Sequence, residues 1–350
     1  MKQSQILVWF GSIALAVVLS TIGVTAEARS IAGSKPPEAC KETTPYKAVK
    51  FVKVAPSVKL EVLDWGGSGE VMVLLTGLGN NAHVYDYFAF QFTDFFHVIG
   101  ITRRGWLPSS QPENGYDVET RAADDIKVLD ALGIKKAVFV GHSIAGSELS
   151  KIAVKYPSYV DKLVYLDAYD RSKALTFPQL PSPPEPTDAD TKSLFPLLAA
   201  AARTGGVRPP IPAVCLQVEF DKDGRVTGET TPDSITTQVS VAASLPTTPP
   251  TNWADIKQPR LGIFAPLTVE SKLPYYPYLS PAEKALFDER LPRYLQWFSD
   301  VIGLFAEQHP RSPTPVVYLM PGASHYVFFN NEAEVVLQMR KFLGLPVAGN

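Results

Sequence analysis

The sequence predicts an α/β fold with a mostly parallel β-sheet and helices on both of its faces. Short, continuous apolar runs alternate with stretches whose apolar residues recur at helical spacing. Continuous apolar runs are typical of parallel strands, which are buried on both faces of the sheet. Alternating strands and helices are what successive βαβ units produce. A proline-rich stretch over residues 171–258 interrupts the alternation and predicts an insertion.

The first elements are two half-exposed strands at 50–54 and 58–63, where apolar and polar residues alternate. Continuous apolar runs then predict buried strands at 71–75 and 97–101. A helix is predicted from Asp117, a good capping residue, to Gly133. The later elements repeat the pattern: strands at 136–140, 163–166, 261–265 and 316–320, and helices over 148–154, from Ser280, and from near Asn331. Ser280, Pro281 and Glu283 form a capping signal for the second of these helices.

Three parts of the chain are expected from these patterns. Residues 1–28 form a leader, residues 29–170 and 259–350 form the α/β core, and residues 171–258 form the insertion. A structureless loop of that length inside a compact domain would be unusual, so we interpret the insertion as a cap or lid.

The leader has the composition of a secretory signal peptide. Lys2 precedes an apolar stretch, and Ala26-Glu27-Ala28 supplies the small-x-small pattern of a cleavage site. Cleavage after Ala28 or Ala26 predicts a secreted or periplasmic protein with no stable membrane association afterwards. An uncleaved anchor is the alternative, but polar and small residues interrupt the apolar run, which makes it a marginal membrane span.

Composition narrows the possible partners. The chain has 350 residues, of which 45% are hydrophobic and 19% charged, so a large core is expected. A formal net charge of −2 gives no electrostatic reason to expect nucleic acid as a partner. The five histidines and two cysteines show no metal-ligand spacing. In an exported protein Cys40 and Cys215 could form a disulfide, although a buried free thiol at Cys215 is equally plausible.

The most informative motif is Gly-His-Ser-Ile-Ala at residues 141–145, between a predicted buried strand and a predicted helix. A serine flanked by small residues at such a junction fits on a sharp turn that exposes its hydroxyl near the first amides of the helix. Ser143 is therefore a candidate nucleophile.

In this pattern the chain resembles the α/β-hydrolase superfamily, in its serine-nucleophile, esterase-like branch with an inserted cap. The resemblance covers residues 50–170 and 259–345, and Ala145 stands where the family's Gly-x-Ser-x-Gly motif has its last glycine. It implies the α/β-hydrolase fold and a catalytic histidine on the loop after the last strand. His325, which follows the strand at 316–320, matches that position.

The third catalytic residue has several candidates. In the family the acid usually follows the strand before the long late helix, where Glu270 is the carboxylate in this chain. Some members carry it after the strand that follows the nucleophile's helix. Asp167 is favoured because it directly ends a buried strand, at the carboxyl edge of the sheet. Asp170 is a further option, and Asp167 would otherwise only cap a turn.

The resemblance also places two main-chain donors for a developing oxyanion. One is the N–H of Ile144, after the nucleophile, and the other is the N–H of Leu78 in the glycine-containing loop after the strand at 71–75. Arg104 is expected to bridge loops near the site. Asn80 and Trp106 are expected to contact the substrate.

The function expected from this resemblance is that of a secreted or periplasmic serine hydrolase that cleaves carboxylic esters or related acyl compounds through an acyl-enzyme intermediate. Such an enzyme needs no cofactor or metal, and its partner is a small acyl substrate. The alternative from another class is a non-catalytic protein or receptor that binds a small molecule on a hydrolase fold.

Overall fold

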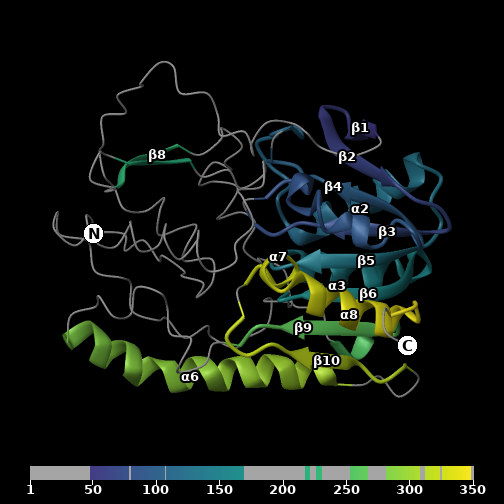
Figure 1. The fold of residues 1–350 in the computed structure, drawn as a ribbon. Coiled ribbons are helices and arrows are strands. Elements are labelled where there is room, and N and C mark those ends of the chain that lie inside the picture. Colours follow the sequence, from purple (N-terminus) through teal and green to yellow (C-terminus); the bar gives the residue numbers. More distant parts are fainter. Residues whose placement is uncertain are drawn as a thin grey trace.

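An eight-stranded sheet forms the centre of the protein. The computed structural model describes residues 48–168 apart from 79 and 107, then 217–220, 226–230, 253–266, 281–307, and 312–347 apart from 324. The strands lie in the order β1 (Ala48–Ala55), β2 (Val58–Gly66), β4 (Phe96–Ile101), β3 (Glu70–Leu75), β5 (Ala137–His142), β6 (Val160–Leu166), β9 (Arg260–Phe264) and β10 (Val316–Leu319) (Figure 1). The β1–β2 and β2–β4 pairs are antiparallel and the other pairs are parallel. The predicted mostly parallel α/β sheet is therefore confirmed.

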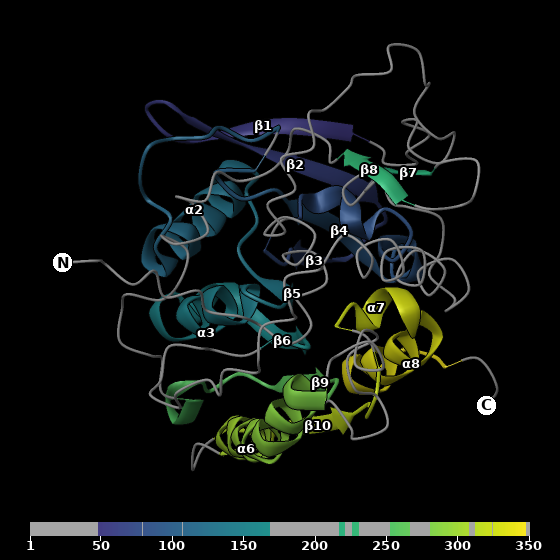
Figure 2. The same cartoon turned by 90° about the vertical axis from the view of Figure 1, so that its left-hand side faces the viewer.

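Helices cover both faces of this sheet (Figure 2). One face carries α2 (Val118–Ala131), α3 (Ala145–Lys155) and α6 (Pro281–Ala306). The other carries the 3₁₀ turns η2 (Ala82–Tyr85) and η3 (Ala89–Gln91), together with α7 (Val327–Asn330) and α8 (Glu332–Leu343). As predicted, α2 is capped by Asp117, whose side chain accepts a hydrogen bond from the Thr120 N–H at 2.9 Å. No helix within the described ranges has both the length and the apolar character needed to cross a membrane.

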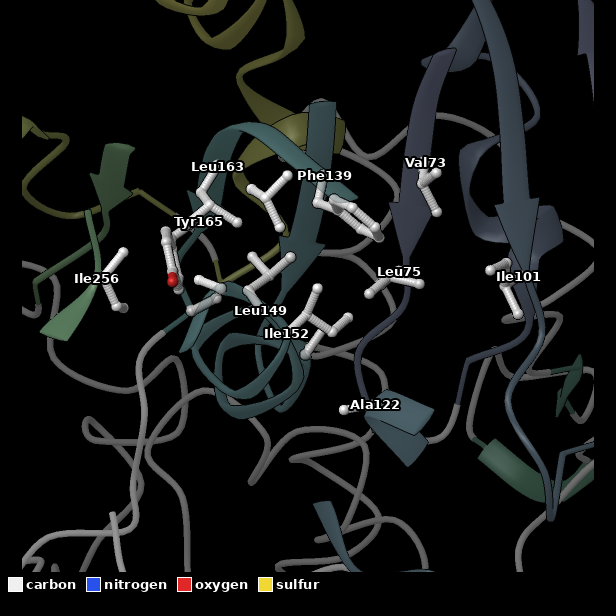
Figure 3. Packing of buried hydrophobic residues seen from close by; sticks show 14 of the residues in the cluster. Val73, Leu75, Ile101, Ala122, Phe139, Leu149, Ile152, Leu163, Tyr165 and Ile256 are labelled. Atoms are coloured by element: carbon white, nitrogen blue, oxygen red, sulfur yellow. The ribbon is translucent and has the colours of Figure 1, made fainter. Parts of the chain in front are cut away.

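Two hydrophobic cores follow from the alternation of side chains along the strands. Leu75 and Phe139 point to the face with α2 and α3, and Leu149 of α3 packs against them (Figure 3). Leu74 and Val140, one residue away from them along each strand, belong to the opposite core. Burial on both faces explains why β3 and β5 are continuous apolar runs.

Only part of the predicted insertion can be described. Strands β7 (Gln217–Phe220) and β8 (Val226–Thr230) form an antiparallel pair, and Trp253 and Ile256 are buried in the core that contains α2, α3 and α6. The end of the insertion thus contributes to that core. The signal peptide at residues 1–28, Cys40 and Cys215 lie outside the described residues, so these expectations and the division of the chain stay predictions.

Candidate active site

The turn between β5 and α3 holds Ser143 in an unusual backbone conformation. Its φ angle is 55°, in the left-handed region that non-glycine residues rarely adopt. The turn is tight, since a Cβ on Gly141 would lie 2.8 Å from Leu149 Cδ1 and 3.0 Å from Ala145 Cβ. The sequence thus forms the sharp turn that the motif predicted, and Ala145 fits within it.

Asp167 occupies the equivalent place at the end of the neighbouring strand, β6. His142 pairs with Leu166 in the sheet register, and the N–H of Ser143 donates to the carbonyl of Leu166 at 3.3 Å. Asp167 has a φ of 42°, and within the described ranges it and Ser143 are the non-glycine residues with positive φ. Strained backbone of this kind clusters at functional sites.

His325 reaches this edge of the sheet from the loop after β10 and pairs with Asp167. Its Nδ1 lies 2.6 Å from Asp167 Oδ2, and both side chains are almost fully buried. The other carboxylate oxygen of Asp167 accepts a hydrogen bond from the Ala265 N–H at 2.9 Å. Because an ionised carboxylate only accepts hydrogen bonds, the ring proton sits on Nδ1, which leaves the lone pair on Nε2. Two of the predicted site residues, 158 positions apart in the chain, are thus in direct contact.

Two buried polar atoms at this edge make no hydrogen bond with any described residue. They are the hydroxyl of Ser143 and Nε2 of His325. Buried polar atoms are normally paired, and unpaired ones are often found where a reaction takes place. In unliganded enzymes the hydrogen bond between nucleophile and base is often long and tightens when substrate binds.

The predicted oxyanion donors lie on the loops next to Ser143. Ile144 is the N-terminal capping residue of α3 and is buried, and Leu78 is half-buried on the loop after β3. That loop is held by the Thr76 hydroxyl, which donates to the carbonyl of Asn80 at 3.0 Å. The amide oxygen of Asn80 accepts from the Tyr326 hydroxyl at 3.1 Å, so the loop also contacts the segment that carries His325.

Two other described histidines, His83 and His97, have carboxylate partners of their own. His97 Nε2 lies 2.8 Å from Asp64 Oδ1. His83 lies between Asp86 and Glu61; burial alone would lower its pKa, but hydrogen bonds and charge interactions with these carboxylates raise the pKa to about 9. Among the described residues there is no group of three or more metal-ligating side chains that could hold a metal ion. Glu270 and Asp170, the other candidate acids, lie outside the described part of the chain.

Comparison with models of known protein families shows which family this chain belongs to. The model of the alpha/beta hydrolase family matches residues 72–338, which is most of the chain. The chain belongs to the alpha/beta hydrolase family. It thus has the fold that the sequence predicted.

Curated relatives match this chain over shorter stretches than the family model does. It is 28% identical to 2-(acetamidomethylene)succinate hydrolase of Mesorhizobium japonicum over 157 residues, which are 44% of this chain and 55% of that protein. It is 35% identical to a non-heme chloroperoxidase of Streptomyces lividans over 108 residues, which are 30% of this chain and 39% of that protein. The matched stretch therefore spans about half, or less, of the length of these relatives.

Solved structures resemble this chain over most of its length. The crystal structure of E-2-(acetamidomethylene)succinate hydrolase superposes with a TM-score of 0.54 at 19% identity, covering 85% of this chain and 99% of that one. A hydrolase from Pseudomonas aeruginosa gives a TM-score of 0.52 at 17% identity, with coverage of 85% and 99%. At such low identities the likeness shows the fold alone.

Sequence reasoning missed one residue next to Ser143, the predicted nucleophile. From the sequence we assigned no role to His142, which directly precedes Ser143. Its ring lies 4.5 Å from the ring of His325, and its Nε2 donates to the His325 carbonyl at 3.0 Å. His142 therefore supports the loop that carries His325, and no signal in the sequence links residues so far apart.

A second missed residue is Arg103. We expected Arg104 to bridge loops near the site, and Arg104 does pair with Asp124 of α2, at 2.7 Å from Nε to Oδ2. The contact with the loop after β3 comes instead from Arg103, whose guanidinium donates to the Gly77 carbonyl at 3.0 Å.

The two residues predicted to contact substrate are both buried. Asn80 is 2% exposed, and Trp106 is fully buried with the Arg103 guanidinium 5.3 Å from its ring centre. Both lie on loops next to the site, and their contact with substrate stays a prediction.

Proposed function

We propose that this protein is a serine hydrolase that cleaves carboxylic esters or related acyl compounds through an acyl-enzyme intermediate. The observation that carries the proposal is the 2.6 Å hydrogen bond between His325 and Asp167 at the strand end beside Ser143. A histidine held in this tautomer by a carboxylate, near a serine on a strained turn, is the arrangement that activates a hydroxyl for attack on a carbonyl.

In the proposed reaction the Ser143 hydroxyl attacks the acyl carbon and His325 Nε2 takes its proton. His325 then gives that proton to the leaving group, and the acyl group remains on Ser143. Asp167 keeps the ring in the required tautomer and stabilises the imidazolium that forms. Water activated by His325 releases the acid in the second half of the reaction.

The N–H groups of Leu78 and Ile144 are proposed to hold the oxyanion. Preorganised main-chain donors stabilise this charge in a buried site more than water does.

A hydrolase among the curated relatives supports hydrolytic chemistry, since 2-(acetamidomethylene)succinate hydrolase is matched over 157 residues. We also propose that residues 1–28 direct export, that the insertion at 171–258 selects the acyl group, and that Asn80 and Trp106 lie beside the bound substrate.

A panel of p-nitrophenyl esters of increasing acyl length tests this function. Wild-type protein should release p-nitrophenol with a burst equal to the enzyme concentration when deacylation limits the rate, and Ser143→Ala should show no burst. Equal release by wild type and Ser143→Ala would contradict the proposal. Tight binding of an acyl ligand without any turnover would favour the alternative of a binding protein.

A further inference from the structure

The guanidinium of Arg103 joins three parts of the candidate site. Arg103 lies in the loop after β4, and the residue is 5% exposed. One nitrogen donates to the Gly77 carbonyl at 3.0 Å. The other donates to the Thr76 carbonyl at 2.5 Å and to Glu148 Oε2 at 2.9 Å. In the proposed mechanism, this buried positive charge has no role.

The contact with the Gly77 carbonyl fixes the direction of a specific N–H. The Gly77 carbonyl and the Leu78 N–H belong to one planar trans peptide unit, in which the two groups point in opposite directions. A donor that holds the carbonyl on one side therefore aims the N–H to the other side. A charged donor also polarises this peptide unit, which strengthens the hydrogen bond that the Leu78 N–H makes.

The contact with Glu148 ties the same guanidinium to the second predicted donor. Glu148 lies in the first turn of α3, the helix capped by Ile144. The carboxylate of Glu148 is itself held by a second buried arginine, Arg121, at 3.0 Å. Arg103 thus connects the loop of Leu78 and the helix start at Ile144 through a single rigid, planar group.

We infer that Arg103 is the positioning residue of the oxyanion hole, which sets the Leu78 N–H relative to the Ile144 N–H. This inference rests on the proposed function. Arg103 does not touch the substrate; it acts through the carbonyls of Thr76 and Gly77. Its loss should weaken the binding of the transition state and leave the binding of the ester almost unchanged.

The test compares two variants of Arg103 with a matched control, using the best ester of the panel. Arg103→Met removes the donors, and Arg103→Lys keeps the charge without the planar fork. Arg104→Met is the control, because Arg104 is the adjacent arginine, is equally buried, and pairs with Asp124 instead of the loop. The measurements are kcat, KM, the melting temperature, and the inhibition constant of a trifluoromethyl ketone, which binds serine hydrolases as a tetrahedral oxyanion.

For Arg103→Met we expect kcat to fall about tenfold to hundredfold, less than the loss typical of removing a donor outright. KM should stay within about twofold, and inhibition by the ketone should weaken by the same factor as kcat. Arg103→Lys should lie between Arg103→Met and wild type. Arg104→Met should lower the melting temperature as Arg103→Met does while keeping kcat.

Equal losses of kcat in the Arg103 and Arg104 variants would overturn the inference, because a general loss of packing would then explain both. An unchanged kcat or an unchanged ketone inhibition in folded Arg103→Met would overturn it too. If both Arg103 variants fail to fold, Glu148→Gln takes their place; a severalfold lower kcat at constant KM supports the inference, and an unchanged kcat refutes it. Wild-type protein that neither turns over esters nor binds the ketone would instead refute the proposed function.

Discussion

At the candidate site, two residues adopt backbone conformations that non-glycine residues disfavour. Ser143 and Asp167 both adopt positive φ angles, and each directly follows a parallel strand. Such conformations persist only where the surrounding structure supports them. Main-chain hydrogen bonds supply that support, since the N–H of Asp167 donates to the Ile263 carbonyl at 2.7 Å and that of Ser143 to the Leu166 carbonyl. This supported backbone conformation therefore fixes the positions from which the Ser143 and Asp167 side chains extend.

The identity of the acid is tested by comparing two conservative substitutions. Asp167→Asn keeps the shape of the side chain but can donate to His325 Nδ1, which favours the wrong ring tautomer. We expect kcat to fall by about 10⁴, the loss typical of this change in serine hydrolases. Glu270→Gln should leave kcat within about threefold of the wild-type value, as expected for a carboxylate outside the triad. A large loss confined to Glu270→Gln would show that Glu270 is the acid.

His83 makes stability depend on pH in alkaline solution. Burial opposes the charged ring, but hydrogen bonds with Asp86 and Glu61 raise its pKa from 6.5 to about 9. A pKa raised in the folded state adds stability that is complete below about pH 6.5 and is lost as the pH rises through about 9. The full contribution is about 3 kcal/mol.

Urea unfolding at pH 6 and at pH 10 measures this effect. Wild-type protein should lose more free energy of unfolding between the two pH values than His83→Gln, because the variant has no ring to deprotonate. An identical loss in the two proteins would show that His83 is not charged in the folded state.

The element that defines the site is the junction of β5 with α3. Gly141 lets the helix approach the strand, because any Cβ there would meet Leu149 and Ala145. Ala145 is fully buried, yet it fits the turn where the family usually has glycine. The turn therefore requires glycine at position 141, whereas position 145 has room for the methyl group of alanine.

Gly141→Ala should accordingly destabilise the junction. An added methyl group in such a packed place costs about 1–3 kcal/mol, and here it also shifts the start of α3 and with it Ile144. We expect a lower free energy of unfolding in urea together with a lower kcat. Ala145→Gly, the control, should change kcat by less than about threefold; a Gly141→Ala protein as stable and active as wild type would contradict this account.

How much the sequence could predict differs between elements and loops. Strands and helices such as β3, β5 and α2 were predictable because periodicity and capping residues are local signals. The choice between Asp167 and Glu270 stayed open, since it depends on which loop meets His325 in space. The roles of His142 and Arg103 were missed for the same reason: each acts through main-chain carbonyls of loops far away in the sequence.

At the scale of the whole molecule, two cores hold the sheet between its helical layers. Phe305, near the end of α6, is fully buried, with ring centres of Phe264 and Tyr165 at 5.1 and 5.2 Å. These contacts fix α6 against the strands β9 and β6. The edge that carries Asp167 and Ala265 depends on the same strands.

Removing the Phe305 ring should therefore cost global stability. Phe305→Ala is expected to lower the free energy of unfolding by about 3–5 kcal/mol, the usual cost of deleting a buried aromatic side chain. Phe51→Ala provides the matched control, because Phe51 is 52% exposed on β1 and its loss should cost less than about 1 kcal/mol. Similar losses measured for both variants in urea unfolding would contradict the packing described here.

The central claim is that the hydroxyl of Ser143 is activated by His325. Mass spectrometry after treatment with a fluorophosphonate tests it most directly, since this reagent reacts with an activated serine. The account predicts one adduct, located on Ser143, that forms quickly on wild type, at least about 100-fold more slowly on His325→Ala, and not at all on Ser143→Ala. An unlabelled Ser143 in folded wild-type protein, or labelling that does not depend on His325, would contradict it.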